Sequence, residues 1–137
     1  MGRIEFKGIY KSFGSKHVLR GVDLNVDPGE VFFVIGQSGA GKSVLVKHLI
    51  GLIRPDAGRV YLDGEDITDF NERQLRPIRM RCATVFQNST LFDSMSLLDN
   101  VALPIRKHRK VNTTKAREMA LEKLKLVGMA EFKDKFP

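Results

Sequence analysis

Two segments near the start of the chain alternate apolar and polar residues. In residues 3–10 and 22–27, apolar residues or glycine recur at every second position. They are Ile4, Phe6, Gly8 and Tyr10, with Ile9 on the opposite side, and then Val22, Leu24 and Val26. A period of two predicts strands with one buried face. The run Val-Phe-Phe-Val-Ile at 31–35 is continuously apolar, which is typical of a central parallel strand.

Further along the chain, apolar spacing and capping residues predict several helices and short strands. A helix is expected at 43–53, where most of the apolar residues fall on one face. Ser96 has the position of a helix N-cap, whose hydroxyl accepts hydrogen bonds from first-turn amides. Strands are also expected at 59–62 and 82–86. A short helix should run from Asn71 to Arg76 and close near Pro77. A longer helix should be capped by Thr113 or Thr114 and followed by Gly128.

The most informative stretch is Gly36-Gln37-Ser38-Gly39-Ala40-Gly41-Lys42-Ser43, which fits the P-loop pattern G-x-x-x-x-G-K-[ST]. Glycines let the backbone approach phosphate oxygens closely, and successive N–H groups form an anion nest. Lys42 would bring positive charge to the β- and γ-phosphates, and the Ser43 hydroxyl would coordinate Mg²⁺. The alternative is a glycine-rich turn without a ligand. The expected strand before the motif and helix after it favour phosphate binding.

Length and composition indicate one domain or part of one. The chain has 137 residues, of which 42% are hydrophobic. No apolar run approaches the ~20 residues that a membrane span needs, and the first residues lack the apolar core of a signal peptide. A single cysteine, Cys82, excludes an internal disulfide and suits a reducing compartment.

The chain is basic, with a formal net charge of +7. Basic chains often contact nucleic acid or anionic lipid surfaces. The densest basic run, at 106–110, lacks the interleaved aromatic residues of a single-strand binder. We therefore interpret this run as a solvated loop and expect no nucleic-acid partner.

These features together resemble the N-terminal half of an ABC-type ATPase, the nucleotide-binding subunit of ABC transporters. Besides the P-loop, the matching segments are Lys11-Ser12-Phe13-Gly14, the block from Gly51 to Gly64, and Val85-Phe86-Gln87-Asn88. The resemblance implies an α/β fold in which an N-terminal antiparallel β-subdomain and P-loop core, about 1–90, precede the start of a helical subdomain, about 91–137. The chain would then be an incomplete ABC ATPase domain.

The resemblance also implies roles for individual residues. Phe13 would stack on adenine, Val18 would pack near the ribose, and Gln87 would contact Mg²⁺ and water. Lys42 and Gln87 would be catalytic, and Ser43 and Gln87 would hold the metal. The implied ATP-binding residues are Phe13, Val18, Gly36, Ser38, Gly39, Ala40, Gly41, Lys42, Ser43 and Val44. Simpler interpretations are that Phe13 is a core aromatic, that Gln87 ends a strand, and that Val18 has no ligand.

A finer resemblance is to the ATPases of Mla-type transporters, which move phospholipid between bacterial membranes. It rests on the segments Ser43 to Leu52, Leu91 to Ser96 and Asn100 to Pro104. Val44 replaces the hydroxyl-bearing residue that usually follows the P-loop serine, so only its backbone N–H can reach the α-phosphate. Lipid or phospholipid is thus the implied substrate.

Several parts of an ABC ATPase do not occur in this sequence. There is no L-S-G-G-Q signature and no second apolar strand ending in Asp-Glu, and His17, His48 and His108 do not match the switch histidine. We therefore expect an N-terminal piece of a longer ATPase that does not hydrolyse ATP alone.

The resemblance implies two partners for the longer protein. They are a transmembrane permease subunit and a second ATPase subunit in a head-to-tail dimer. The expected location is the cytoplasmic face of the bacterial inner membrane, reached through the permease. The alternatives are an ABC ATPase for another substrate, a nucleotide-sensing module without hydrolysis, and a nucleic-acid-binding protein with an incidental P-loop.

Overall fold

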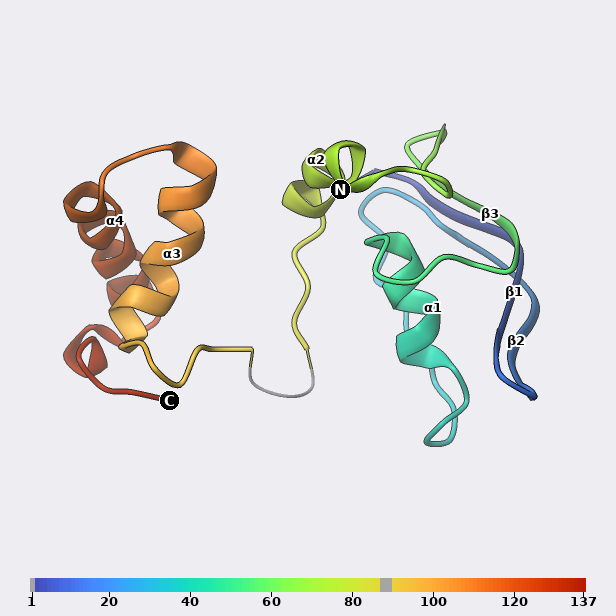
Figure 1. Ribbon diagram of the computed structural model, residues 1–137, viewed down its shortest axis with the longest axis horizontal. Coiled ribbons are helices and arrows are strands. Elements are labelled where there is room, and N and C mark those ends of the chain that lie inside the picture. The colour runs from blue at the N-terminus through green and yellow to red at the C-terminus, as the bar shows by residue number, and fades with distance from the viewer. Residues whose placement is uncertain (1, 87–89) are drawn as a thin grey trace. The chain divides into compact units, whose positions relative to one another are not determined.

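The computed structural model of the chain describes residues 2–86 and 90–137 (Figure 1). The chain divides into two compact units, Met1–Thr84 and Val85–Pro137, and each unit is considered by itself. None of the helices in the described ranges has the length and apolar character required to cross a bilayer.

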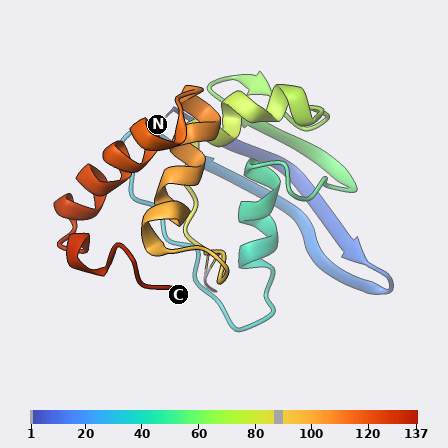
Figure 2. The ribbon, with the colours of Figure 1, turned by 60° about the vertical axis from the view of Figure 1, so that its left-hand side comes forward.

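The first unit is built on an antiparallel sheet with the strand order β2-β1-β3-β4 among its described residues. The strands are β1 (Ile4–Phe13), β2 (Lys16–Val26), β3 (Ala57–Leu62) and β4 (Glu65–Asp66). β1 lies in the interior of the sheet and pairs with both β2 and β3. β1 and β2 form a long curved hairpin, whose connecting turn is visible in Figure 2. The two strands predicted near the start of the chain are therefore present, and the second begins earlier than its pattern indicated.

A β-bulge at Gly8 changes which side chains of β1 enter the core. The register of β1 against β2 shifts between Phe6 and Ile9, and Gly8 has a φ of 58°. A bulge adds a residue to one strand, so the alternation beyond it is displaced by one position. Ile9 is therefore fully buried, whereas Tyr10 is 49% exposed. The predicted alternation is wrong from Gly8 onward because a strict period of two ignores the bulge.

Two helices, α1 (Lys42–Leu49) and α2 (Glu72–Arg81), share a hydrophobic core with the sheet. The most deeply buried side chains of this core come from the strands and are Ile9, Val60 and Leu62. The helices and their C-terminal ends contribute Leu45, Leu49, Ile50, Ile78 and Cys82. Burial of apolar surface contributes roughly 25 cal/mol per Å². The apolar face of α1 therefore fixes this helix, and the P-loop before it, to the sheet.

The predicted strands at 31–35 and 82–86 are not formed, and these two predictions are wrong. The side chains of the first run are largely exposed, by 77% at Val31 and 89% at Ile35. A central strand needs hydrogen-bonded neighbours on both sides. In the part of the chain that the structure describes, no strand pairs with either segment. The run instead borders an apolar groove of about 220 Å³, together with the sheet and α1.

Helix α2 begins with a capping box and runs through a proline. The side-chain oxygen of Asn71 accepts hydrogen bonds from two first-turn amides, and the Gln74 side chain accepts one from the Asn71 amide. The helix continues past Pro77 to Arg81, so the predicted end near Pro77 is wrong. Proline removes one N–H donor. The buried side chain of Ile78 packs into the core and keeps the second half of the helix in place.

The second unit is a helical hairpin of α3 (Leu97–Arg109) and α4 (Thr113–Leu126), followed by the 3₁₀ turn η1 (Ala130–Phe132). The buried residues of the hairpin contact are small, namely Ala102, Ala116 and Ala120. Larger apolar side chains, including Leu98 and Ile105, pack around them. The hairpin thus has a small core of its own.

Capping residues define the ends of both long helices. Ser96 caps α3 as predicted, since its hydroxyl accepts a hydrogen bond from the amide three residues on, at 3.2 Å. The cap of α4 is Asn112 rather than Thr113 or Thr114, and its side-chain oxygen accepts a hydrogen bond at 2.8 Å. Asparagine is at least as good a cap as threonine. Gly128 follows α4 with a φ of 69°, as predicted for a residue after a helix.

The contact between β1 and β3 leaves no room for a side chain at Gly58. A Cβ atom there would overlap the Gly8 carbonyl group and lie 2.6 Å from the Lys7 carbonyl oxygen, and Gly58 has a φ of 94°. We expect Gly58→Ala to lower the free energy of unfolding by about 3 kcal/mol, because positive φ and overpacking both disfavour alanine. Urea unfolding followed by circular dichroism measures the change.

The matched control is Gly14→Ala. Gly14 also has a positive φ, 59°, but nothing lies within 4 Å of its would-be Cβ. Its expected loss is about 1 kcal/mol, from backbone conformation alone. Equal losses in the two variants would contradict the proposed steric role of Gly58.

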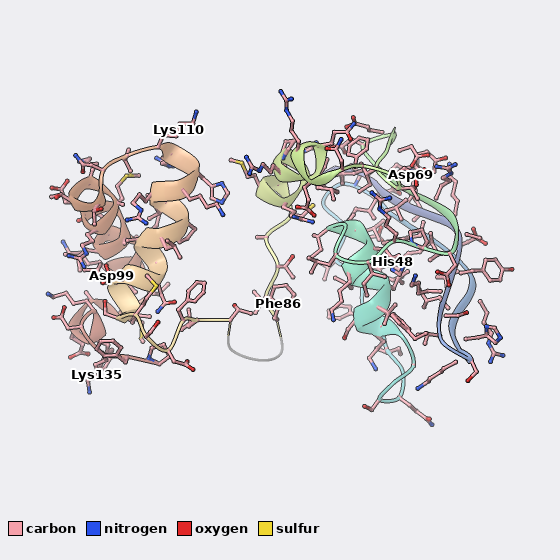
Figure 3. The ribbon with its side chains drawn as sticks, in the orientation of Figure 1. His48, Asp69, Phe86, Asp99, Lys110 and Lys135 are labelled. Carbon is pink, nitrogen blue, oxygen red and sulfur yellow. The ribbon has the colours of Figure 1, made fainter. Side chains whose placement is uncertain are left out.

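His48 on α1 is almost completely buried, with 3% of its surface exposed (Figure 3). Its Nδ1 lies 2.6 Å from the Val44 carbonyl oxygen and donates to it, whereas Nε2 has no partner among the described residues. A neutral ring with its proton on Nδ1 fits this environment, because a charged ring would bury an unpaired N–H group. Burial lowers the pKa of His48, and the positive charge of Lys11 lowers it further.

This environment predicts acid sensitivity. The pKa of His48 is lower in the folded chain than its ordinary value of 6.5, so the unfolded chain binds more protons below that pH. The contribution of His48 to the free energy of unfolding should therefore be constant above about pH 6.5. It should fall as the pH drops from there through the folded-state pKa and level off below it. Urea unfolding at a series of pH values measures this profile. The fall should be smaller in His48→Leu. It should be unchanged in His108→Gln, which is a control at an exposed position. Identical profiles in the unmodified chain and both variants would refute the assignment to His48.

Candidate functional site

The segment Gly36–Ser43 forms the turn that leads into α1. Gly36, Gly39 and Gly41 have φ values of 155°, 81° and 96°, a region that residues with side chains rarely adopt. The Ala40 amide donates to the Gln37 carbonyl oxygen at 3.2 Å and closes the tip of the loop. The glycines of the motif are therefore required by the backbone path, as the pattern predicts for a phosphate-binding loop.

Lys42 is held inside this loop by the backbone. Its ammonium group donates to the carbonyl oxygens of Gly36 at 2.6 Å and Gln37 at 2.8 Å. The side chain therefore folds back over the loop and holds its charge against the loop backbone. These contacts fix the position of the charge, and no carboxylate of the described residues forms an ion pair with it.

The N-terminus of α1 supplies the second part of an anion site. Its N-cap is Gly41, which has no side chain to accept hydrogen bonds from the first turn, and that turn contains no acidic residue. The first hydrogen bond at the helix start runs from the Leu45 amide to the Gly41 carbonyl oxygen, at 2.8 Å. The preceding amides and the positive end of the helix dipole are thus available to an anion.

Ser43 and Val44 follow Lys42 in the first turn of α1. Ser43 is exposed, so its hydroxyl is accessible to a metal ion bound with a nucleotide. Val44 is half-buried, and its carbonyl oxygen is occupied by His48. Across residues 2–86 and 90–137, no group of three or more His, Cys, Asp or Glu side chains could hold a metal ion. Among the described residues of the P-loop, the Ser43 hydroxyl is the group suited to a Mg²⁺ ion that accompanies nucleotide phosphates.

Strand β2 packs directly against the P-loop. A Cβ atom at Gly41 would lie 2.9 Å from side-chain atoms of both Val18 and Leu19. The structure therefore brings Val18, which was expected near the ribose, next to the glycine that precedes Lys42. This proximity depends on the absence of a side chain at Gly41.

Phe13 lies at the end of β1, on the same hairpin as Val18, and is 49% exposed. The ammonium of Lys11 lies 5.7 Å from the centre of its ring, a cation–π distance. A half-exposed ring retains surface for stacking on a purine. The other expected residue, Gln87, lies outside the described residues.

Sequence reasoning did not single out Asp56, which holds the end of β1 in place. Its carboxylate accepts hydrogen bonds from the Lys11 ammonium at 2.6 Å and from the Ser12 amide at 2.7 Å. Its own amide donates to the Tyr10 carbonyl oxygen at 2.9 Å. The bond from Lys11 lowers the pKa of Asp56 below the usual range of aspartate. Only its place in a Pro-Asp-x-Gly turn hinted at a local role.

The site therefore combines a glycine-rich loop, a lysine positioned by the loop backbone and an uncapped helix N-terminus, and β2 packs against the loop through Val18 and Leu19. Its geometry is suited to the phosphates of a nucleotide.

Comparison with known proteins agrees with this geometry. Residues 19–137 match the family model described as ABC transporter. The chain is 45% identical over 134 residues to the "Probable ribonucleotide transport ATP-binding protein mkl" of Mycobacterium leprae. This match covers 98% of this chain and 39% of that protein. It is 39% identical to the "Methionine import ATP-binding protein MetN" of Rhizobium etli, covering 94% of this chain and 36% of that protein.

A solved structure gives the same result for the fold. The match has a TM-score of 0.83 at 32% sequence identity and covers 98% of this chain and 61% of the other. That structure is described as the dimeric post-hydrolysis state of the ATP-binding cassette MJ0796 bound to ADP and Pi. The predicted fold, a partial ABC ATPase domain with an antiparallel sheet and helices, is confirmed.

The chain spans about two fifths of the length of the curated relatives described above, 39% and 36% respectively. The family match extends over most of the chain and includes the P-loop. The chain belongs to the ABC transporter family, as an ATP-binding domain.

Proposed function

We propose that this chain is the ATP-binding part of a transport ATPase that powers movement of a substrate across a bacterial membrane. The observation that carries the proposal is the position of Lys42, whose ammonium lies within the glycine-rich loop at 2.6 Å and 2.8 Å from two loop carbonyl oxygens. A fixed positive charge inside an anion nest is suited to a polyphosphate chain.

In this mechanism the chain acts by positioning and electrostatics. The adenine stacks on Phe13, and Val18 contacts the sugar from its place beside Gly41. The loop amides and Lys42 bind the β- and γ-phosphates and stabilise the charge that develops during phosphoryl transfer. When bound, Mg²⁺ neutralises phosphate charge, and Ser43 and Gln87 are the residues that would hold it.

The sequence lacks the carboxylate that positions and activates water in this family. It contains no L-S-G-G-Q segment and no apolar strand ending in Asp-Glu. We therefore expect the chain alone to bind nucleotide weakly and to release no phosphate. In the whole protein, hydrolysis would require a second ATPase subunit arranged head to tail, and a transmembrane permease subunit would place the assembly on the inner face of the membrane.

For the substrate we propose phospholipid. This choice rests on the resemblance of three segments, at 43–52, 91–96 and 100–104, to Mla-type ATPases. The printed names of the curated relatives refer to ribonucleotide transport and methionine import, so these two substrates are the alternatives.

The nucleotide site is tested by Lys42→Ala. Removing the ammonium loses a charge-assisted hydrogen bond to phosphate, so the dissociation constant of a fluorescent ATP analogue should rise about thirtyfold, or about 2 kcal/mol. Fluorescence titration with Mg²⁺ present measures this constant. Lys47→Ala, on the same helix beyond the loop, should bind the analogue as the unmodified chain does. Unchanged affinity in Lys42→Ala would reject the proposed site.

The substrate is tested on the full-length protein with its membrane subunits in proteoliposomes. We expect ATP hydrolysis to accompany transfer of a labelled phospholipid, and to stop in Lys42→Ala while Lys47→Ala retains it. Transport of methionine or of a ribonucleotide in the same assay, without phospholipid transfer, would reject the lipid assignment and leave the nucleotide site intact.

A further inference from the structure

Positive charge is concentrated at the C-terminal end of α3, in the second unit. From residue 100 to residue 117 the sequence contains basic residues and no acidic residue. The basic residues of this stretch are Arg106, Lys107, Arg109, Lys110, Lys115 and Arg117. A long stretch with one sign of charge creates a local electrostatic potential, because no charges of opposite sign lie between its members to cancel it.

Two of these residues are neutralised by neighbours. Arg117 donates to both carboxylate oxygens of Asp99, at 2.7 Å and 2.9 Å, and Lys115 donates to Glu118 at 2.9 Å. The remaining four form what we call the basic end, namely Arg106, Lys107, Arg109 and Lys110. All four are exposed, and none has a carboxylate oxygen within 4.0 Å in the described ranges.

The helix dipole explains only part of this arrangement. Basic residues are favourable in the last turn of a helix, because the unpaired carbonyl groups there carry negative partial charge. That charge amounts to about half an elementary charge. The basic end carries four positive charges over the same turn, so a large excess remains to attract an external anion.

The backbone places this charge where the chain turns from α3 into α4. Lys110 ends α3 in the left-handed conformation, with φ 53° and ψ 34°, and the chain reverses there into α4. Figure 3 shows Lys110 at the tip of the hairpin, opposite the end that carries Asp99 and Lys135. Exposed charges at the end of a helical hairpin are accessible to an extended charged surface.

We propose that the basic end binds the anionic headgroups of a phospholipid bilayer. Clusters of four or more Lys and Arg residues on an amphipathic helix attract anionic lipid, at about fivefold in affinity per charge. Nucleic acid fits less well, because residues 93–131 contain no Phe, Tyr or Trp on which bases could stack. This contact uses no nucleotide and is therefore separate from the function proposed above.

The test is sedimentation of the chain with phosphatidylcholine vesicles that contain or lack phosphatidylglycerol, without nucleotide. The chain should bind the anionic vesicles and lose affinity at high salt, because the attraction is screened. The variant in which all four residues of the basic end become Gln should bind at least about a hundredfold more weakly.

Two matched variants make the result specific. Replacing Lys123, Lys125, Lys133 and Lys135 with Gln removes the same charge from the same unit and should weaken binding far less. The double variant Arg106→Lys with Arg109→Lys keeps the charge and should bind as the unmodified chain does. Circular dichroism checks that each variant keeps its helices.

Three results would overturn the proposal. The first is an equal loss of affinity in the control with four altered lysines. The second is binding to neutral vesicles that does not respond to salt. The third is tighter binding to a single-stranded oligonucleotide than to anionic vesicles at the same salt, which would assign the basic end to nucleic acid.

Discussion

The close approach of β2 to Gly41 is the constraint on which the first unit depends. A Cβ atom at Gly41 would lie 2.9 Å from side-chain atoms of both Val18 and Leu19. These two residues can therefore pack against the loop because the glycine has no side chain. The same residue is the left-handed N-cap of α1. One position therefore joins the hairpin that carries Phe13 to the loop that carries Lys42. Its backbone freedom serves packing and anion binding together.

Those parts of the fold that depend on local chemistry were predictable from the sequence. The P-loop glycines adopt the expected conformations, Ser96 caps α3, and Gly128 follows α4 with positive φ. In each case the determining interaction lies within about one helical turn, so the residue type carries most of the information. The cap of α4 was placed at Thr113 or Thr114, one or two residues too late, because Asn112 and threonine are both good caps.

Features that depend on distant partners were not predictable. The bulge at Gly8 moves Ile9 into the core, and no local pattern distinguishes this glycine from others in a strand. The run at 31–35 has the composition of a central strand, yet strand formation requires neighbours, and none pairs with it among the described residues. Asp56 acts through Lys11 and Ser12, which are far away in the sequence. Pairing and ion contacts of this kind are properties of the tertiary structure.

The two carbonyl contacts of Lys42 have a thermodynamic consequence for ligand discrimination. Two of the three N–H donors of this ammonium are engaged by carbonyl oxygens at 2.6 Å and 2.8 Å, so a phosphate that takes more than the third donor must replace one of these hydrogen bonds. The binding energy is then the difference between two sets of contacts, and a neutral carbonyl is a substantial competitor. Only a ligand with dense negative charge gains much from the exchange. The loop would thus rank nucleotides by the charge that they present at the lysine, and a monophosphate that stops short of it would gain nothing there.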